Sequence, residues 1–449
     1  MKAALVTLSG LRIRDQSLMD LGFSFPAVRN RANQIESLPS LGLLTVAACL
    51  PDTWHLTYIE SREIGPRFSW EQFDVVFFSF LSATSAEAFS LSRSVRDVGI
   101  KTVAGGLHVT LVPDECRPHF DILVCGEAEA CLPDLVTDLE TNNNTRFVYD
   151  ARPRGPFDLN KAPMPRFDLL DPEKYSRVSI QTQRGCPWSC SFCASSIRLV
   201  PGFRAKPVPH VINEIRAVKK IFRQPFIELA DDNTFADKRH ARELVEAIAG
   251  EGIEWFTETD ISLSDDEGLL ERLAESGCRQ VLIGLESPTA NDLAGIEMVA
   301  NWKARKSQSY MKAIEKIQSY GVSVNGCFVL GLDGQGPECF EATFDFVEKS
   351  GLYDVQITFL TPFPGTPAYK KLSDEGRILI EPAGPLCTLF DINFKPDHMS
   401  VHELREGFYK LAARLYAPEN IRKRNRHFVR TSRSRRNTTD NGKSHGHKN

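Results

Sequence analysis

Three closely spaced cysteines carry the strongest chemical signal in this chain. Cys186, Cys190 and Cys193 follow a Cys-x3-Cys-x2-Cys pattern, directly after Arg184-Gly185 and a short run with the character of a β-strand. Iron–sulfur clusters are held by cysteine thiolates, so three cysteines can bind three irons of a cubane. The fourth iron then stays open to a ligand that the protein does not supply. The spacing therefore predicts a 4Fe-4S cluster with one open iron.

Other uses of these cysteines have less support. A structural zinc site needs a fourth ligand, yet the nearest downstream histidine is His210 and no second Cys-x2-Cys pair exists. Disulfides are disfavoured because the eleven cysteines are odd in number and nothing in the sequence indicates an oxidising compartment. A binding or regulatory protein that holds metal without turnover stays open as an alternative to an enzyme.

The segment 184–196 closely resembles the cysteine motif of the radical S-adenosylmethionine (SAM) superfamily. The resemblance implies that SAM binds the open iron and that one electron from the reduced cluster cleaves it to a 5′-deoxyadenosyl radical. Phe192, just before the last cysteine, matches a position that commonly packs near the adenine in this superfamily. The resemblance also implies a low-potential electron donor of the flavodoxin or ferredoxin type.

The composition is that of a globular protein. The 449 residues are 42% hydrophobic and 25% charged, and this length predicts two or three domains. No apolar run reaches the roughly 18 residues that a membrane span needs, and the apolar part of the N-terminus is too short for a secretory signal. We therefore expect no transmembrane segment and a cytoplasmic location.

Residues 1–140 alternate short apolar runs with helical segments, which predicts a doubly wound parallel sheet. Such sheets bind ligands at the carboxyl ends of their strands, where glycines let a ligand approach the backbone. This region resembles the cobalamin-binding domain that precedes the barrel in one radical SAM subclass. The resemblance implies cobalamin as a cofactor, with contacts from strand-end residues: Ser79, Ser82, Gly105, Gly106, His108, Gly126 and Glu127.

One known cobalamin signature is absent. The pattern Asp-x-His-x-x-Gly, whose histidine binds cobalt from below, does not occur in the sequence. The subclass that the chain resembles often lacks this pattern, so its absence does not exclude cobalamin. The absence does leave the lower face of the cobalt without an evident ligand. A domain that has lost the corrin, or never bound it, stays open as an alternative. His108 is then either a corrin contact or a solvated loop residue.

Residues 177–367 repeat a strand–helix pattern, which predicts a partial (β/α)6 barrel with its chemistry at the carboxyl ends of the strands. A proline-rich linker is expected before it, at 141–176. Several strand-end residues resemble SAM-binding positions of the superfamily: Asp231, Asp232 and Asn233 for the methionyl amine, Glu286 for the ribose or methionine portion, and Gly331 for the adenosine. Asp232 and Glu286 would otherwise be surface acids or helix caps.

Two segments follow the barrel. Residues 368–420 resemble the carboxyl-terminal extension of one group of cobalamin-type radical SAM proteins, and we expect a small helical region with a capping box at Ser400–Glu403. Residues 421–449 hold ten Lys or Arg against one acid, Asp440, with few apolar residues. Burial then offsets too little of the ordering entropy, so we expect a disordered, solvated tail that does not bind nucleic acid.

These features together predict an α/β enzyme that forms a 5′-deoxyadenosyl radical and abstracts hydrogen from an unactivated carbon. The resemblance to the cobalamin-type subclass implies C-methylation of that carbon. The alternative is the same cluster chemistry without methyl transfer, for ring closure, carbon–carbon bond formation or oxidation. The substrate, a small molecule or a lipid, does not follow from the sequence.

Overall fold

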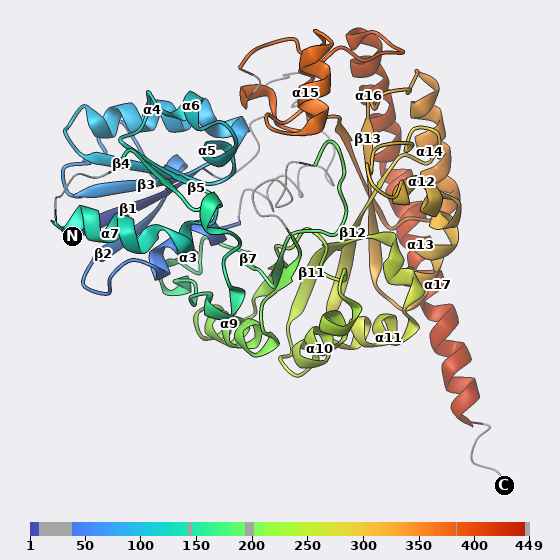
Figure 1. Cartoon of the computed structure of the whole chain (residues 1–449). Coiled ribbons are helices and arrows are strands. Elements are labelled where there is room, and N and C mark those ends of the chain that lie inside the picture. The colour runs from blue at the N-terminus through green and yellow to red at the C-terminus, as the bar shows by residue number, and fades with distance from the viewer. Residues whose placement is uncertain (9–37, 142–145, 194–201, 383, 445–449) are drawn as a thin grey trace.

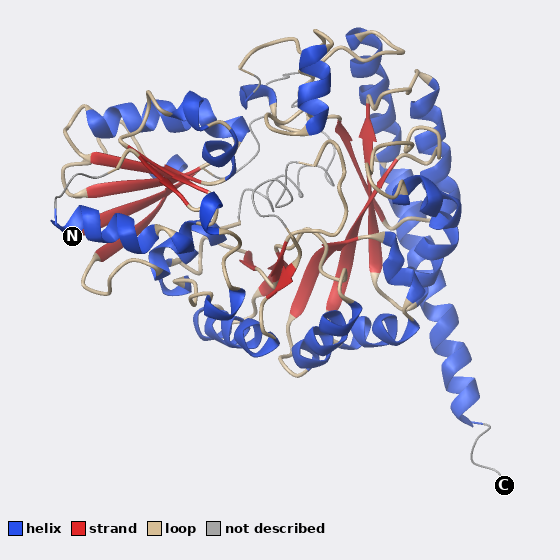
Figure 2. Ribbon diagram, viewed as in Figure 1, coloured by secondary structure: helices blue, strands red, loops and turns tan. Residues whose placement is uncertain are grey.

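Two six-stranded parallel sheets, one in each half of the chain, form the framework (Figure 1). The structure is a computed structural model that describes residues 1–8, 38–141, 146–193, 202–382 and 384–444. Helices cover both faces of the first sheet, whereas the helices of the second sheet lie along its outer, convex side (Figure 2). The α/β architecture predicted from the sequence is confirmed.

The first sheet is doubly wound, with strand order β2-β1-β3-β4-β5-β6. Its strands are β1 (Lys2–Thr7), β2 (His55–Glu60), β3 (Val75–Ser79), β4 (Lys101–Gly105), β5 (Ile122–Cys125) and β6 (Val148–Asp150). Successive residues of β3 enter opposite cores, because strand side chains alternate between faces. One face is covered by α3 (Leu41–Ala48) and α7 (Leu132–Thr141), the other by α4 (Ser85–Arg96), α5 (Leu107–Leu111) and α6 (Pro113–Cys116).

Strand β6 lies within the segment expected to be a linker. Its Val148 and Asp150 pair with Leu123 and Cys125 of β5, so the first sheet continues past the expected boundary at residue 140. The sequence did not indicate this strand, because its three residues are too few to show an alternating pattern and the surrounding segment is rich in proline.

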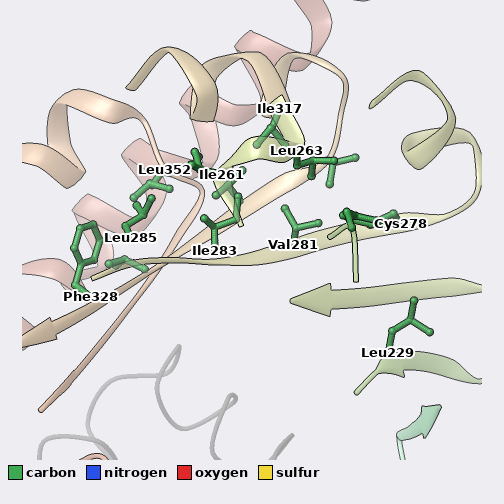
Figure 3. Packing of buried hydrophobic residues seen from close by; sticks show 14 of the residues in the cluster. Leu229, Ile261, Leu263, Cys278, Val281, Ile283, Leu285, Ile317, Phe328 and Leu352 are labelled. Carbon is green, nitrogen blue, oxygen red and sulfur yellow. The ribbon is translucent and has the colours of Figure 1, made fainter. Parts of the chain in front are cut away.

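The second sheet forms the partial barrel, with strand order β14-β13-β12-β11-β10-β7. Its strands are β7 (Arg177–Ile180), β10 (Phe226–Leu229), β11 (Glu254–Thr259), β12 (Cys278–Glu286), β13 (Ser323–Leu330) and β14 (Asp354–Phe359). The helices are α9 (Val208–Ile221), α10 (Lys238–Ala249), α11 (Glu267–Glu275), α12 (Trp302–Lys306), α13 (Tyr310–Ser319) and α14 (Glu338–Ser350). Val281, Ile283 and Leu285 of β12 point into the core beneath these helices (Figure 3). Leu282 and Gly284 of the same strand line a cavity on the concave side, as strand alternation requires.

A small antiparallel hairpin joins the cysteine loop to the barrel. Strand β8 (Gln183–Arg184) pairs with β9 (Arg204–Ala205), and the cysteines lie in the loop between them. Gly185 has φ 87°, and a side chain there would overlap the carbonyl oxygen of Gly202. Only glycine therefore lets the two strands meet at the base of this loop.

The chain ends with α15 (Pro367–Asp374), α16 (Val401–Leu415) and α17 (Pro418–Ser444). The predicted capping box is present, because Ser400 and Glu403 bond each other's backbone N–H at the start of α16. No helix in the described ranges is both long and apolar enough to cross a membrane.

The prediction of a disordered tail from residue 421 is wrong for the part that the structure describes. These residues continue α17, which lies along α13 before it extends away from the body (Figure 1). Arg424 is buried and donates to the carbonyl oxygen of Leu415 at 2.8 Å, and Phe428 stacks edge-on against Tyr353. Docking onto the barrel supplies the burial that the composition of the tail alone does not.

Candidate functional site

The cysteine loop is held by the segment that follows β12. Backbone hydrogen bonds run from Ser191 N to the Ile296 carbonyl and from Met298 N to the Ser189 carbonyl, at 2.8 and 3.0 Å. The buried carboxylate of Glu297 accepts from three backbone N–H groups of its own loop at 2.7–3.3 Å. It also accepts from Ser189 N at 3.4 Å. These bonds fix the loop's path.

The three cysteines line one cavity of about 300 Å³ on the concave side of the barrel. Burial raises the pKa of the Cys186 thiol to about 11 and that of Cys190 to about 12. The negative charge of Cys193 also acts to raise both pKa values. A bound metal would have to displace these protons, as it does wherever thiols become ligands.

The donor set fits a cubane better than a single ion. Across the described ranges, no group of three or more His, Cys, Asp and Glu side chains is arranged to hold a metal ion. A cubane does not require such convergence, because each thiolate binds a different iron. The structure therefore gives no support to a zinc site at the cysteines.

Four of the residues predicted to bind SAM line the same cavity as the cysteines: Phe192, Asp232, Asn233 and Glu286. They come from the cysteine loop and from the carboxyl ends of β10 and β12, where the barrel pattern placed them. The other two, Asp231 and Gly331, are not on its wall.

Asp231 is a buried structural group. Its carboxylate accepts from the backbone N–H groups of Thr182 and Gln183 at 2.7 and 3.1 Å. It also accepts from the hydroxyls of Thr182 and Thr234 at 2.6 and 2.8 Å. Burial raises the pKa of Asp231, although these hydrogen bonds act in the opposite direction. Asp231 therefore fixes the end of β7 just ahead of the cysteine loop.

Gly331 packs against the carboxyl-terminal extension. It has φ 87°, and an added Cβ would lie 2.8 Å from Phe394 and 2.9 Å from Leu404. Its N–H donates to the side-chain oxygen of Gln335 at 2.9 Å. Close packing and backbone conformation thus account for this glycine without a ligand.

Asp260 was not identified from the sequence, yet it lies on the cavity wall. One of its oxygens accepts from Asn233 Nδ2 at 2.7 Å and from Trp188 Nε1 at 2.9 Å. Burial acts to raise the pKa of Asp260, but hydrogen bonds from Ser262, Trp188 and Asn233 outweigh it and hold the pKa below its usual value. The strand-end rule could have found Asp260, because it directly follows β11.

Lys303 is a second residue that the sequence did not indicate. Its ammonium donates to Glu286 Oε1 at 2.8 Å and to the Gly284 carbonyl at 2.7 Å. Although burial acts to lower the pKa of Lys303, the Glu286 carboxylate raises it above its usual value. Glu286 itself has φ 64°, so the chain turns sharply where β12 ends. The ion pair lies beside Cys190 on the cavity wall.

A second cavity, of about 440 Å³, lies between the first sheet and the barrel. Five predicted corrin contacts line it: Ser79, Gly105, Gly106, Gly126 and Glu127. The barrel contributes the opposite wall through Gln181, Arg184, Ala230 and Asp232. Asp232 lines both cavities, so the two meet at the end of β10.

Two glycines of this wall lie in tight turns that a side chain would strain. Gly106 has φ 99°, and an added Cβ would lie 3.2 Å from Ser79 Oγ. Gly126 has φ 83°, and an added Cβ would lie 3.1 Å from the Arg152 side chain. Exposed backbone edges above apolar side chains such as Val103 and Leu132 fit a large flat ligand of the corrin type. Among the described residues of this wall there is no histidine, cysteine or methionine that could bind cobalt.

Ser82 and His108 are not on the wall of either cavity. His108 is wholly buried, with Nδ1 3.0 Å from Ser82 Oγ and its ring among Phe80 and Phe89. It is therefore neither a solvated loop residue nor a group that faces the second cavity. The turn at Gly106 starts α5, which packs on the opposite face of the sheet and takes His108 with it.

The neighbouring acids Asp231 and Asp232 give a matched test of this description. Asp231→Ala removes the acceptor for four hydrogen bonds in the interior, so we expect a loss of about 3 kcal/mol in the free energy of unfolding. Asp232→Ala removes a cavity side chain and should change stability by less than about 1 kcal/mol. Urea unfolding of the two variants measures both values, and equal losses would contradict the different placement of the two carboxylates.

Family models match three consecutive parts of the chain. A model of the radical SAM superfamily matches residues 180–347, and a model of the B12 binding domain matches residues 34–136. A domain of unknown function, DUF4070, matches residues 366–448. The three matches follow the order of the cobalamin-type half, the barrel and the carboxyl-terminal extension.

Similar proteins carry methyltransferase names. The chain is 26% identical over 396 residues to the bacteriochlorophyllide d C-12(1)-methyltransferase of Chlorobaculum tepidum, covering 86% of this chain and 84% of that protein. It is 26% identical over 405 residues to the hopanoid C-2 methylase of Rhodopseudomonas palustris, covering 86% and 73%. The solved structure of the radical SAM methyltransferase TsrM from Kitasatospora setae, with cobalamin and a [4Fe-4S] cluster bound, has the same fold. The TM-score is 0.62 at 15% identity, covering 83% of this chain and 78% of TsrM.

Proposed function

Because this chain belongs to the radical SAM superfamily, in the subclass with a cobalamin-binding domain, we propose that it methylates an unactivated carbon of a small-molecule substrate. The observation that carries this proposal is the pair of cavities that meet at Asp232. One is lined by the three cysteines and the other by the glycine-rich ends of the first sheet. When bound there, the cluster and cobalamin supply the reductive cleavage of SAM and the transfer of its methyl group.

Cys186, Cys190 and Cys193 would hold the cluster. Asp232 and Asn233 lie where they can receive the methionyl ammonium of SAM, because a carboxylate and an amide oxygen both accept hydrogen bonds from it. Phe192 offers a flat apolar face to the adenine. Each of these side chains is on the wall of the cysteine cavity.

Polar groups on this wall are already oriented by their neighbours. Asn233 is held by Asp260, and Glu286 is held by Lys303. Such fixed groups need little reorganisation when a ligand arrives, which favours a single bound geometry. In the Lys303–Glu286 pair, each buried charge is balanced by the other. We infer that it orients Glu286 toward the ribose or methionine portion of SAM.

Ser79, Gly105, Gly106 and Gly126 would support cobalamin through their backbone and small side chains. Since the described wall offers no histidine, cysteine or methionine for the cobalt, this chain's part would be to shape the site around the corrin edge. Electrons would come from a flavodoxin or ferredoxin type donor. All eleven cysteines are free thiols, which supports a reducing compartment such as the cytoplasm.

The test starts with the full chain purified without oxygen and reconstituted with iron, sulfide and hydroxocobalamin. It is then given dithionite and SAM labelled in the methyl group. We expect 5′-deoxyadenosine to accumulate, and label to appear in the protein-bound corrin together with S-adenosylhomocysteine. Chromatography of the nucleosides and the corrin measures all three.

Two outcomes separate the alternatives. Deoxyadenosine without any label in the corrin would contradict methyl transfer and favour radical chemistry of another kind, such as ring closure or oxidation. Absence of deoxyadenosine from fully reconstituted protein would contradict an enzyme of this class altogether. It would favour a metal-binding protein without turnover.

A further inference from the structure

A buried ionic cluster ties the cobalamin-type half to the base of the cysteine loop. Arg184 donates from Nη1 to Glu127 Oε1 and from Nη2 to Glu129 Oε1, both at 2.5 Å. Its Nε donates to Gln181 at 2.7 Å. We call Glu127, Glu129 and Arg184 the carboxylate clamp. Both glutamate side chains are 7% exposed and that of Arg184 is 14% exposed, so solvent screens these pairs little.

A second arginine strengthens the carboxylate clamp from the other strand of the hairpin. Arg204 is the direct cross-strand partner of Arg184, and it donates to both Glu127 oxygens at 3.2 Å. Two arginines opposite each other repel when alone. Glu127 removes this repulsion, so the hairpin that closes the cysteine loop depends on a residue from the other half of the molecule.

The carboxylate clamp also forms part of the second cavity. Glu127, Glu129 and Arg184 all lie on its wall, and Arg184 precedes the first cluster cysteine, Cys186, by two residues. A ligand that fills this cavity therefore packs against the same side chains that hold the base of the cysteine loop. Asp232 lines both cavities, whereas the carboxylate clamp connects the second cavity to the base of the cysteine loop.

We propose that the carboxylate clamp couples the two cofactor sites, so that occupancy of one strengthens binding at the other. This proposal rests on the proposed function, because it requires cobalamin in the second cavity and a cluster on the cysteines. Coupling of this kind is reciprocal: if the cluster tightens cobalamin binding by a given factor, cobalamin tightens cluster retention by the same factor. Arg184, Glu127 and Glu129 are positioning residues in this scheme.

The experiment measures cobalamin affinity, with and without the cluster, in full-length protein. Hydroxocobalamin is titrated under nitrogen into apo-protein and into protein reconstituted with iron and sulfide, and bound corrin is followed by its visible spectrum. We expect the cluster to tighten cobalamin binding by about 10-fold in the parent protein. In Arg184→Gln and in Glu129→Gln this ratio should fall below about 2-fold.

The matched control is Arg154→Gln. Arg154 also pairs with a carboxylate, Asp134, and donates to the Ala130 carbonyl, but this pair is more exposed and Arg154 touches neither the hairpin nor the second cavity. We expect it to keep the parent ratio. A second readout is the rate at which a chelator removes iron, which bound cobalamin should slow in the parent and in Arg154→Gln but not in the clamp variants.

Equal ratios in the parent and in both clamp variants would overturn the proposal, as would a parent ratio near one. Glu129→Gln removes only one of the three bonds of Arg184, so it keeps the test decisive if Arg184→Gln does not fold. Parent protein that binds both cofactors independently would refute the coupling alone. Parent protein that binds no cobalamin would refute the proposed function as well.

Discussion

Cys190→Ala protein will retain less cluster iron than the parent and will form 5′-deoxyadenosine at least about 100-fold more slowly. Loss of a residue that only supports a metal ligand typically costs about 10- to 100-fold, and loss of the ligand itself should cost more. Cys190 is the most buried of the three cluster cysteines and is bridged to Glu297 by backbone pairing. Without its sulfur, one iron loses its protein ligand and the open iron is no longer held at the SAM-binding wall. Iron and sulfide analysis, with chromatography of deoxyadenosine, measures both effects.

Cys339→Ala is the control for this change. Cys339 is also a buried free thiol, on α14, and it lines neither of the two cavities. We expect it to bind a full complement of iron and to cleave SAM at the parent rate. A full iron content and an unchanged rate in Cys190→Ala would refute the cluster assignment, and with it the proposed function.

Gly105→Ile will weaken cobalamin binding by about 100-fold or more, equivalent to about 2.7 kcal/mol. Gly105 ends β4 on the wall of the second cavity, on the same face as Val103, so a long side chain there occupies space meant for the corrin. Its φ is not positive, so the substitution adds volume without backbone strain. Titration with hydroxocobalamin measures the change. The variant should still cleave SAM to 5′-deoxyadenosine, because the cysteine cavity is unchanged.

Gly105→Ala separates volume from other effects. An added Cβ would meet only Val124, at 3.5 and 3.6 Å, which is ordinary contact. We therefore expect cobalamin affinity within about 3-fold of the parent, a change of about 0.7 kcal/mol. If the Gly105→Ile variant bound cobalamin as tightly as the parent, the corrin would not lie in this cavity.

The fold was predictable because long periodic elements dominate it. The apolar run Val75–Phe78 of β3 and the repeated strand–helix units of the barrel are patterns that burial imposes on the sequence. Strand β6 was missed because it is only three residues long, and both β6 and the docked start of α17 also depend on distant partners. Each is stabilised by partners distant in the sequence, such as Tyr353 for Phe428, and local composition does not contain that information.

The site was predictable in part. The cysteines and Asp232 follow from motif spacing and strand ends, and the structure brings them to one wall. Lys303 did not follow, because its role depends on a side chain that reaches back from α12 to Glu286. Asp231 and Asp232 are adjacent in the sequence, yet one is sealed inside and the other faces the ligand space. Only three-dimensional placement distinguishes them.

The wall shared between the two halves limits how this protein can be taken apart or recombined. Gln181, Arg184, Ala230 and Asp232 complete a pocket whose other side belongs to the first sheet. If the amino-terminal domain were expressed alone, one side of its corrin cavity would be open to solvent. If that domain were replaced by one from a distant homologue, its cavity would no longer fit the barrel residues that complete the wall. The two domains must therefore change together in evolution.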